Sequence, residues 1–181
     1  PSDRDSMIFA DGAGANIIEA SNSSGGILSH NTATYANDEV FYLFYGKSYN
    51  PNSDQNKKYI KMRGRKVYEF ALKNVPAAIK ECIDKSKSNI SEIKKILIHQ
   101  ANAKMEDAIV KRLYKLYSLE APENIMPLTV DRFGNSSVAT VPTMYDLILN
   151  ENLDNHQIKK GDKIIFASVG AGMHINAMVY E

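Results

Sequence analysis

Cysteine is almost absent from this sequence, which has only Cys82 among its 181 residues. A single cysteine excludes an intrachain disulfide framework and favours a reducing, cytoplasmic compartment. Long apolar runs are also missing, so we expect neither a membrane span nor a signal peptide. Charge of one sign is not in excess, since 22 Lys and Arg oppose 21 Asp and Glu for a net charge of +1. Neither a nucleic-acid partner nor a membrane surface is indicated.

The sequence also does not indicate a metal site, a reactive cysteine or a phosphate-binding loop. The four histidines and Cys82 lack metal-ligand spacing, so no metal and no cofactor are predicted. Cys82 lies in register with Val75 and Ile79 on the apolar face of a predicted helix, so we expect a buried, inert thiol. Asp11-Gly12-Ala13-Gly14 has the glycine content of a phosphate-binding loop. A strand-like run follows it, however, where such a loop needs a helix.

The alternation of strands and helices predicts one α/β domain over residues 1–181, with a hairpin at each end. Residues 37–56 are rich in Tyr, Asn, Ser and Asp and predict a long surface insert. The expected strands are Met7–Ala10, Asn16–Ala20, Ile27–Tyr35, Ile96–Ile98, Leu128–Val130, Lys163–Ala167 and His174–Tyr180. The expected helices are Met62–Lys85 with a kink or break at Pro76, Asn102–Tyr117 capped by Asn102, and one from Ser136 or Ser137 to Asn150.

Polar residues follow three of the predicted strands. His99-Gln100-Ala101-Asn102 follows Ile98, Asn135 follows Leu128–Val130, and Gly170-Ala171-Gly172 precedes the last strand. Ligands of α/β proteins bind at the carboxyl ends of strands. An imidazole and a carboxamide can together donate hydrogen bonds to one developing oxyanion, and glycine amides can serve another. This set favours acyl transfer or enolate chemistry over phosphoryl or hydride transfer.

Other polar residues have either two interpretations, one functional and one structural, or only an ordinary structural one. His174 either lines the cavity of His99 or is a hydrogen-bonded strand histidine, and His156 is expected to be solvated. A basic cluster is either the solvated start of a helix or a contact surface for an anionic partner. Its members are Lys57, Lys58, Lys61, Arg63, Arg65 and Lys66.

The sequence resembles the carboxyl-terminal half of β-ketoacyl-acyl-carrier-protein synthase III, a thiolase-fold condensing enzyme. His99-Gln100-Ala101-Asn102 and the block from Asp131 to Ser137 carry the resemblance. Pro1-Ser2-Asp3-Arg4, Phe9–Ala15 and Lys61-Met62-Arg63-Gly64 extend it over almost the whole chain. The resemblance implies a thiolase-like half with α/β/α layers and a mixed sheet of about five strands.

The resemblance also implies a Cys-His-Asn site. In the family, an acyl-CoA primer acylates the cysteine, malonyl-acyl-carrier protein loses its carboxylate, and the resulting carbanion attacks the acyl-enzyme to start fatty acid synthesis. His99 and Asn135 match the pair that binds the malonyl thioester carbonyl and stabilises the enolate.

Further positions follow from the same resemblance. The backbone of Gly170, Ala171 and Gly172 matches an oxyanion hole, and Gly64 and Asn102 match positions that line the pantetheine tunnel. Lys104 matches a basic position that receives acyl-carrier protein, an acidic partner.

The sequence also departs from the family. The nucleophilic cysteine of the family lies in the amino-terminal half and Cys82 does not match it. Arg65 stands where asparagine is common, Ala171 interrupts a glycine triplet, and residues 37–56 match poorly.

The start at Pro1 predicts a fragment that is inactive without the amino-terminal half and that forms a homodimer through an uncovered apolar face. Two alternatives stay open. One is a related thiolase-fold acyltransferase with another acceptor, and the other is a non-catalytic half that binds acyl-carrier protein.

Overall fold

The computed structural model describes residues 2–22 and 24–181, so Pro1 of the Pro1–Arg4 match lies outside the described residues. The strands are β1 (Ile27–Thr34), β2 (Leu43–Lys47), β3 (Lys58–Met62), β4 (Ile93–Ile98), β5 (Lys163–Gly170) and β6 (His174–Tyr180). The α-helices are α1 (Gly64–Ser86), α2 (Ala103–Lys115), α3 (Val130–Phe133) and α4 (Thr140–Leu149). Short 3₁₀ turns are η1 (Arg4–Ile8), η2 (Asp38–Tyr42), η3 (Ile90–Glu92), η4 (Ser137–Ala139) and η5 (Ala171–Met173).

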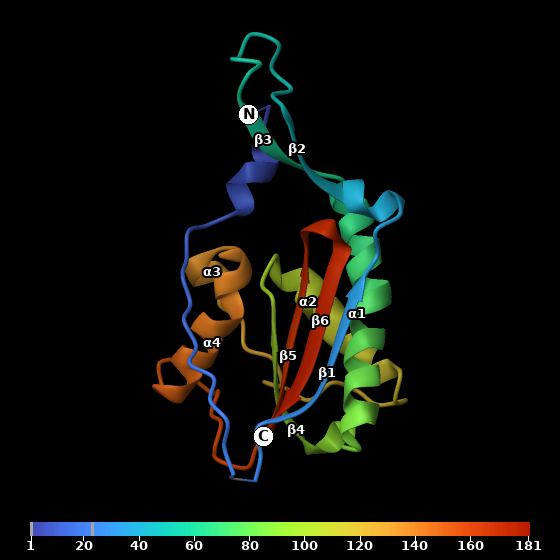
Figure 1. Ribbon diagram of the computed structural model, residues 1–181, viewed down its shortest axis with the longest axis vertical. Coiled ribbons are helices and arrows are strands. Elements are labelled where there is room, and N and C mark those ends of the chain that lie inside the picture. Colours follow the sequence, from blue (N-terminus) through green and yellow to red (C-terminus); the bar gives the residue numbers. More distant parts are fainter. Residues whose placement is uncertain (1, 23) are drawn as a thin grey trace.

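The main sheet is mixed and has the spatial order β1-β6-β5-β4. β4 and β5 are parallel, whereas β5–β6 and β6–β1 are antiparallel. β2 and β3 form a separate antiparallel hairpin at one end of the molecule (Figure 1). The predicted α/β fold with a mixed sheet is therefore confirmed, with four strands in the main sheet.

Helices cover both faces of the sheet, but unequally. α1 packs across β1, β5 and β6 and against α2, whereas α4 packs on β4 and β5 on the other side (Figure 1). Alternation along β4 explains this arrangement, because successive strand side chains point to opposite faces. Ile96 and Ile98 belong to the cluster with α1 and α2, and Leu97 joins Met144 and Ile148 of α4. Among the described residues, α4 does not extend its main contacts to β1 or β6.

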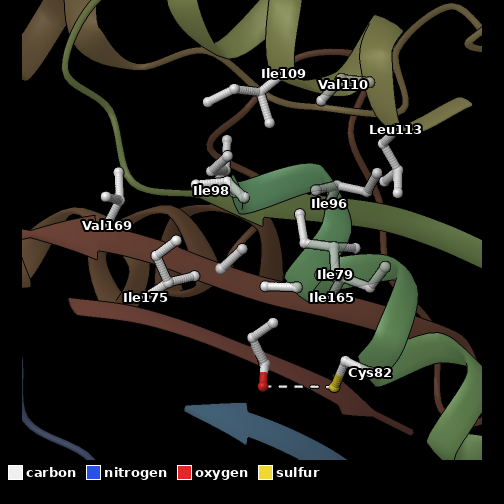
Figure 2. Packing of buried hydrophobic residues seen from close by; sticks show 14 of the residues in the cluster. Ile79, Cys82, Ile96, Ile98, Ile109, Val110, Leu113, Ile165, Val169 and Ile175 are labelled. Carbon is white, nitrogen blue, oxygen red and sulfur yellow. Dashed lines mark hydrogen bonds between the residues drawn. The ribbon is translucent and has the colours of Figure 1, made fainter. Parts of the chain in front are cut away.

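The core lies between the sheet and the helices α1 and α2 (Figure 2). The predicted helix Met62–Lys85 is confirmed as α1. A kink or a break was expected at Pro76, and the break is wrong because the helix continues through this residue. Cys82 is fully buried, with its Sγ 3.2 Å from Ser29 Oγ. The expected structural role of this thiol therefore agrees with its position.

The predicted amino-terminal hairpin is wrong. Residues Arg4–Ile8 form η1, and the chain then runs extended past α3 and α4 to β1 (Figure 1, blue). Ile17 and Ile18 are 97% and 85% exposed. Apolar spacing there favours a strand, but no other strand among the described residues lies beside it. Gly12 and Gly14 instead allow close approach, since a Cβ on them would lie 2.8 Å from Ser136 Cβ and 2.4 Å from Pro142 Cγ.

The predicted strand Leu128–Val130 is also wrong, because α3 begins at Val130. The segment does approach β4, where Ile96 N–H donates to Ile125 O at 2.9 Å. Pro127 then has no N–H to donate. The N–H of Thr129 donates to the Gln100 side chain at 3.1 Å rather than to a strand. These two residues end the pairing with β4. They therefore explain why the expected fifth strand is absent from the main sheet.

The region 37–56 is more regular than predicted, since η2 and β2 lie within it. Lys61 on β3 is not part of an exposed basic cluster as predicted, because its side chain is 1% exposed and forms an ion pair with Asp3. Its Nζ also lies 3.6 Å from the centre of the Tyr49 ring. None of the helices in residues 2–22 and 24–181 has the length and hydropathy to span a bilayer.

We expect Ile79→Ala to lower the free energy of unfolding by about 3 kcal/mol, because it opens a cavity between α1 and the sheet. Urea denaturation followed by circular dichroism measures the change. Lys73→Ala, on the exposed face of the same helix, is the control and should change stability by less than about 0.5 kcal/mol. Equal losses for both variants would contradict this location of the core.

Candidate functional site at the strand ends

His99 directly follows β4 and points into a cavity at the end of the sheet. The main-chain N–H of His99 donates to Ala167 O at 2.9 Å, which extends the β4–β5 pairing by one residue. Its Nδ1 lies 3.3 Å from Ser137 O, and a carbonyl only accepts, so this nitrogen carries the hydrogen. The other ring nitrogen, Nε2, has no hydrogen-bond partner among the described residues.

Asn135 is buried at the start of the segment that leads to α4. Its main chain is tied to the amino-terminal segment, with Ala10 N–H donating to Asn135 O at 2.9 Å and Asn135 N–H donating to Ile8 O at 3.2 Å. Its Oδ1 accepts from Ser137 N–H at 2.9 Å. Nδ2 has no hydrogen-bond partner in the described part of the chain, so two N–H donors remain for a ligand.

One peptide segment therefore contacts both side chains. The N–H of Ser137 bonds to Asn135, and the carbonyl of Ser137 bonds to His99. His99 and Asn135 also line a single cavity of about 840 Å³. The expectation that an imidazole and a carboxamide from distant parts of the chain share one hollow agrees with this geometry.

Most of the other predicted site residues lie around the same cavity. Gly64, Asn102, Gly170 and Ala171 line it. Asn102 is the predicted cap of α2 and accepts from Met105 N–H at 2.9 Å.

Two predicted site residues are not part of the lining. Lys104 is exposed on the first turn of α2. Gly172 has φ +74°, and a Cβ there would lie 2.6 Å from His174 Nε2, so both conformation and space favour glycine.

Both interpretations of His174 hold at once. The residue lines the cavity, and its Nδ1 lies 2.8 Å from Thr34 Oγ1. The cavity also includes polar residues that the sequence analysis did not assign to it, namely His30, Thr32, Ser168 and Asn176. Their period-two spacing on β1 and β5–β6 was the available signal, since alternate residues share a face. His156, by contrast, is not simply solvated, because its Nδ1 is buried without a partner in the described residues.

Burial shifts the pKa values of two groups near the cavity. Desolvation lowers the pKa of His99, and the bond to Ser137 opposes this effect. Desolvation raises the pKa of Glu106, although bonds from the N–H groups of Ala101 and Asn102 oppose it. At neutral pH the His99 ring is therefore uncharged, with its hydrogen on Nδ1. Within residues 2–22 and 24–181, no three His, Cys, Asp or Glu residues gather in a metal-binding group.

The mixed sheet and its layers define a thiolase-like half, as comparison with a solved structure shows. β-Ketoacyl-[acyl carrier protein] synthase III of Thermus thermophilus has a TM-score of 0.72 at 26% identity, over 88% of this chain and 47% of that one. Residues 83–181 match the family described as 3-oxoacyl-[acyl-carrier-protein (ACP)] synthase III C terminal, and the chain belongs to this family.

Curated relatives agree with this assignment. β-Ketoacyl-[acyl-carrier-protein] synthase III 2 of Lactiplantibacillus plantarum is 30% identical over 185 residues, 97% of this chain and 53% of that protein. The synthase III of Erythrobacter litoralis is 32% identical over 170 residues, 92% of this chain and 49% of that protein. The chain thus spans about half the length of the curated relatives it matches.

We expect His99 to make stability depend on pH below 6.5. Its folded pKa lies below the unfolded value of about 6.5, so between the two the unfolded chain binds more protons and stability falls as the pH drops. Above 6.5 this contribution is constant. Denaturation of the wild type and His99→Gln at several pH values isolates it, because the slope from His156, whose pKa is also lowered, is common to both. Identical slopes would contradict a buried neutral ring.

Proposed function

We propose that this chain is the carboxyl-terminal half of a decarboxylating condensing enzyme. The reaction joins an acyl-CoA primer to malonyl-acyl-carrier protein and gives 3-oxoacyl-acyl-carrier protein at the start of fatty acid synthesis. The observation that carries the proposal is that His99 and Asn135 line one cavity and both contact Ser137, while His99 Nε2 and Asn135 Nδ2 have no hydrogen-bond partner among the described residues. Family membership supports the same reaction class.

In the proposed decarboxylation, the bond between the malonyl α-carbon and its carboxylate breaks, and CO₂ leaves. The electron pair stays on the α-carbon and is delocalised onto the thioester oxygen. Asn135 Nδ2 and His99 Nε2 donate hydrogen bonds to this oxygen, and such donors act most strongly in a site that excludes water. The α-carbon then attacks the acyl-cysteine carbonyl, a carbon–carbon bond forms, and the thiolate leaves.

The protonation state of His99 constrains this step. A neutral ring donates from one nitrogen only, and in the free protein that nitrogen is Nδ1. Donation to substrate from Nε2 requires either a second proton, which burial disfavours, or transfer of the hydrogen from Nδ1 to Nε2. The contact to Ser137 O is long, at 3.3 Å, so we propose the second route, in which solvent takes the proton from Nδ1 and supplies one to Nε2, and the ring gives up its contact with Ser137 O when substrate binds.

The remaining roles extend the proposal. Backbone amides of Gly170, Ala171 and Gly172 form the oxyanion hole of the acyl-cysteine, and Gly64 and Asn102 line the pantetheine tunnel. Because Cys82 is buried in the core, the nucleophile in this proposal is supplied by an amino-terminal half. This chain spans only about half the length of its curated relatives, which agrees with that role. The proposed partners are that half, acyl-carrier protein, the two thioester substrates and a second copy of the chain.

We expect His99→Ala and Asn135→Ala each to lower malonyl decarboxylation about 10²- to 10³-fold, as loss of one oxyanion donor does. Release of CO₂ from malonyl-acyl-carrier protein by the full-length protein measures it. His156→Ala, a histidine outside the cavity lining, should retain activity.

The same assay separates the alternatives. A wild-type protein that transfers acyl groups without releasing CO₂ would be an acyltransferase with another acceptor. Mixing this chain with an amino-terminal half that carries the cysteine tests the binding-module alternative. Binding of carrier protein without condensation by that mixture, or by the full-length protein, would contradict the enzyme proposal.

We expect Lys104→Glu to raise the KM for malonyl-acyl-carrier protein about tenfold at low salt, with little change for malonyl-CoA, because an acidic carrier loses a cation. The effect should shrink as salt screens the charge. Lys115→Glu, at the opposite end of α2, is the matched control. Equal effects on both substrates would contradict a role of Lys104 in carrier binding.

A further inference from the structure

Glu106 is a fully buried carboxylate that the proposed reaction does not use. It lies on α2 at 0% exposure, next to Met105, which lines the cavity. Its Oε1 accepts from Ala101 N–H at 2.8 Å and from Asn102 N–H at 3.1 Å. Its Oε2 is buried without a hydrogen-bond partner among the described residues.

The partners of this carboxylate belong to the segment that carries His99 rather than to the helix itself. Asn102 already caps α2 through Met105 N–H. Ala101 precedes the cap, so its N–H is not among the donors that the helix leaves free. From its buried position, Glu106 therefore accepts hydrogen bonds from the main-chain N–H groups of Ala101 and Asn102, the two residues that follow His99-Gln100.

Gln100 holds the same segment from the other side. It is 0% exposed, and its Nε2 donates to Ile98 O at 3.2 Å and Pro127 O at 3.4 Å. Its Oε1 accepts from Thr129 N–H. The residues before and after His99 are thus fixed by buried polar side chains, which leaves the imidazole little freedom to shift.

Stability alone does not explain a carboxylate in this place. Burying a charged group is costly, and one oxygen of Glu106 gains no bond from the part of the chain that the structure describes. An apolar residue would fill the same core position at lower cost. In some proteins a costly buried group is kept because function depends on it.

We propose that Glu106 is a positioning residue that fixes the His99–Asn102 segment, and with it the imidazole, for the reaction under "Proposed function". The role rests on that function for its kinetic consequence only. Its structural content, the anchoring of the amides of Ala101 and Asn102, stands independently.

The test uses the full-length protein with Glu106→Met, which removes both acceptors, and Glu106→Gln, which keeps one. For Met we expect kcat of malonyl decarboxylation to fall about 10- to 100-fold with KM within about threefold, since a misplaced group impairs chemistry more than binding. For Gln we expect kcat within about fivefold of the wild type. Asp107→Asn, on the exposed side of the same helix turn, is the control.

Hydrogen exchange gives a readout that does not need activity. The amides of Ala101 and Asn102 should exchange at least about tenfold faster in Glu106→Met, with the core of α1 unchanged, and should stay protected in Glu106→Gln and Asp107→Asn. If Glu106→Met does not fold, Glu106→Asp keeps the charge, shortens the reach and carries the same expectations.

Unchanged protection of the two amides in the folded variant would overturn the proposal, and so would unchanged kcat with lost protection. A wild type that does not decarboxylate malonyl thioesters would instead overturn the proposed function. In that case the exchange result still decides whether Glu106 anchors the segment.

Discussion

The backbone of Ser137 is the constraint on which the cavity depends. Its N–H donates to the Asn135 carboxamide at 2.9 Å, and in the free protein its carbonyl lies 3.3 Å from Nδ1 of the His99 imidazole, although the two residues belong to different segments of the chain. Ser137 has φ +55°, a left-handed conformation that costs a residue other than glycine about 1 kcal/mol. The strain is tolerated because the surrounding bonds hold this peptide in place. Any movement of the segment before α4 therefore alters both side chains together.

The sequence indicated much of this site because its polar residues follow short apolar runs. His99 after Ile98 and the glycine turn before His174 both lie where β4 and β5 end, as their positions predicted. The shared contact through Ser137 was not predictable, because it depends on a backbone conformation that serine rarely adopts. The anchoring role of Glu106 was missed for a related reason. A charged residue on a helix is usually exposed, and only the packed structure reveals its burial.

Two of the three wrong strands, Asn16–Ala20 and Leu128–Val130, have one cause. Apolar alternation reports which residues favour extended backbone, whereas a strand exists only when a neighbour supplies hydrogen bonds. Leu128–Val130 does not pair as a strand, because Pro127 has no N–H to donate and the N–H of Thr129 donates to the Gln100 side chain. Residues 16–20 have the composition of a strand but pair with no strand among the described residues. The helices were easier to predict because their hydrogen bonds are internal, and α1 keeps its apolar period even across Pro76.

The extended segment around Ile17 and Ile18 has a consequence for how this polypeptide behaves in solution. Two β-branched side chains stand almost wholly in water beside backbone groups that no sheet among the described residues occupies. Such a stretch is a template to which a strand from any other molecule can add. At high concentration the chain by itself is therefore prone to aggregation.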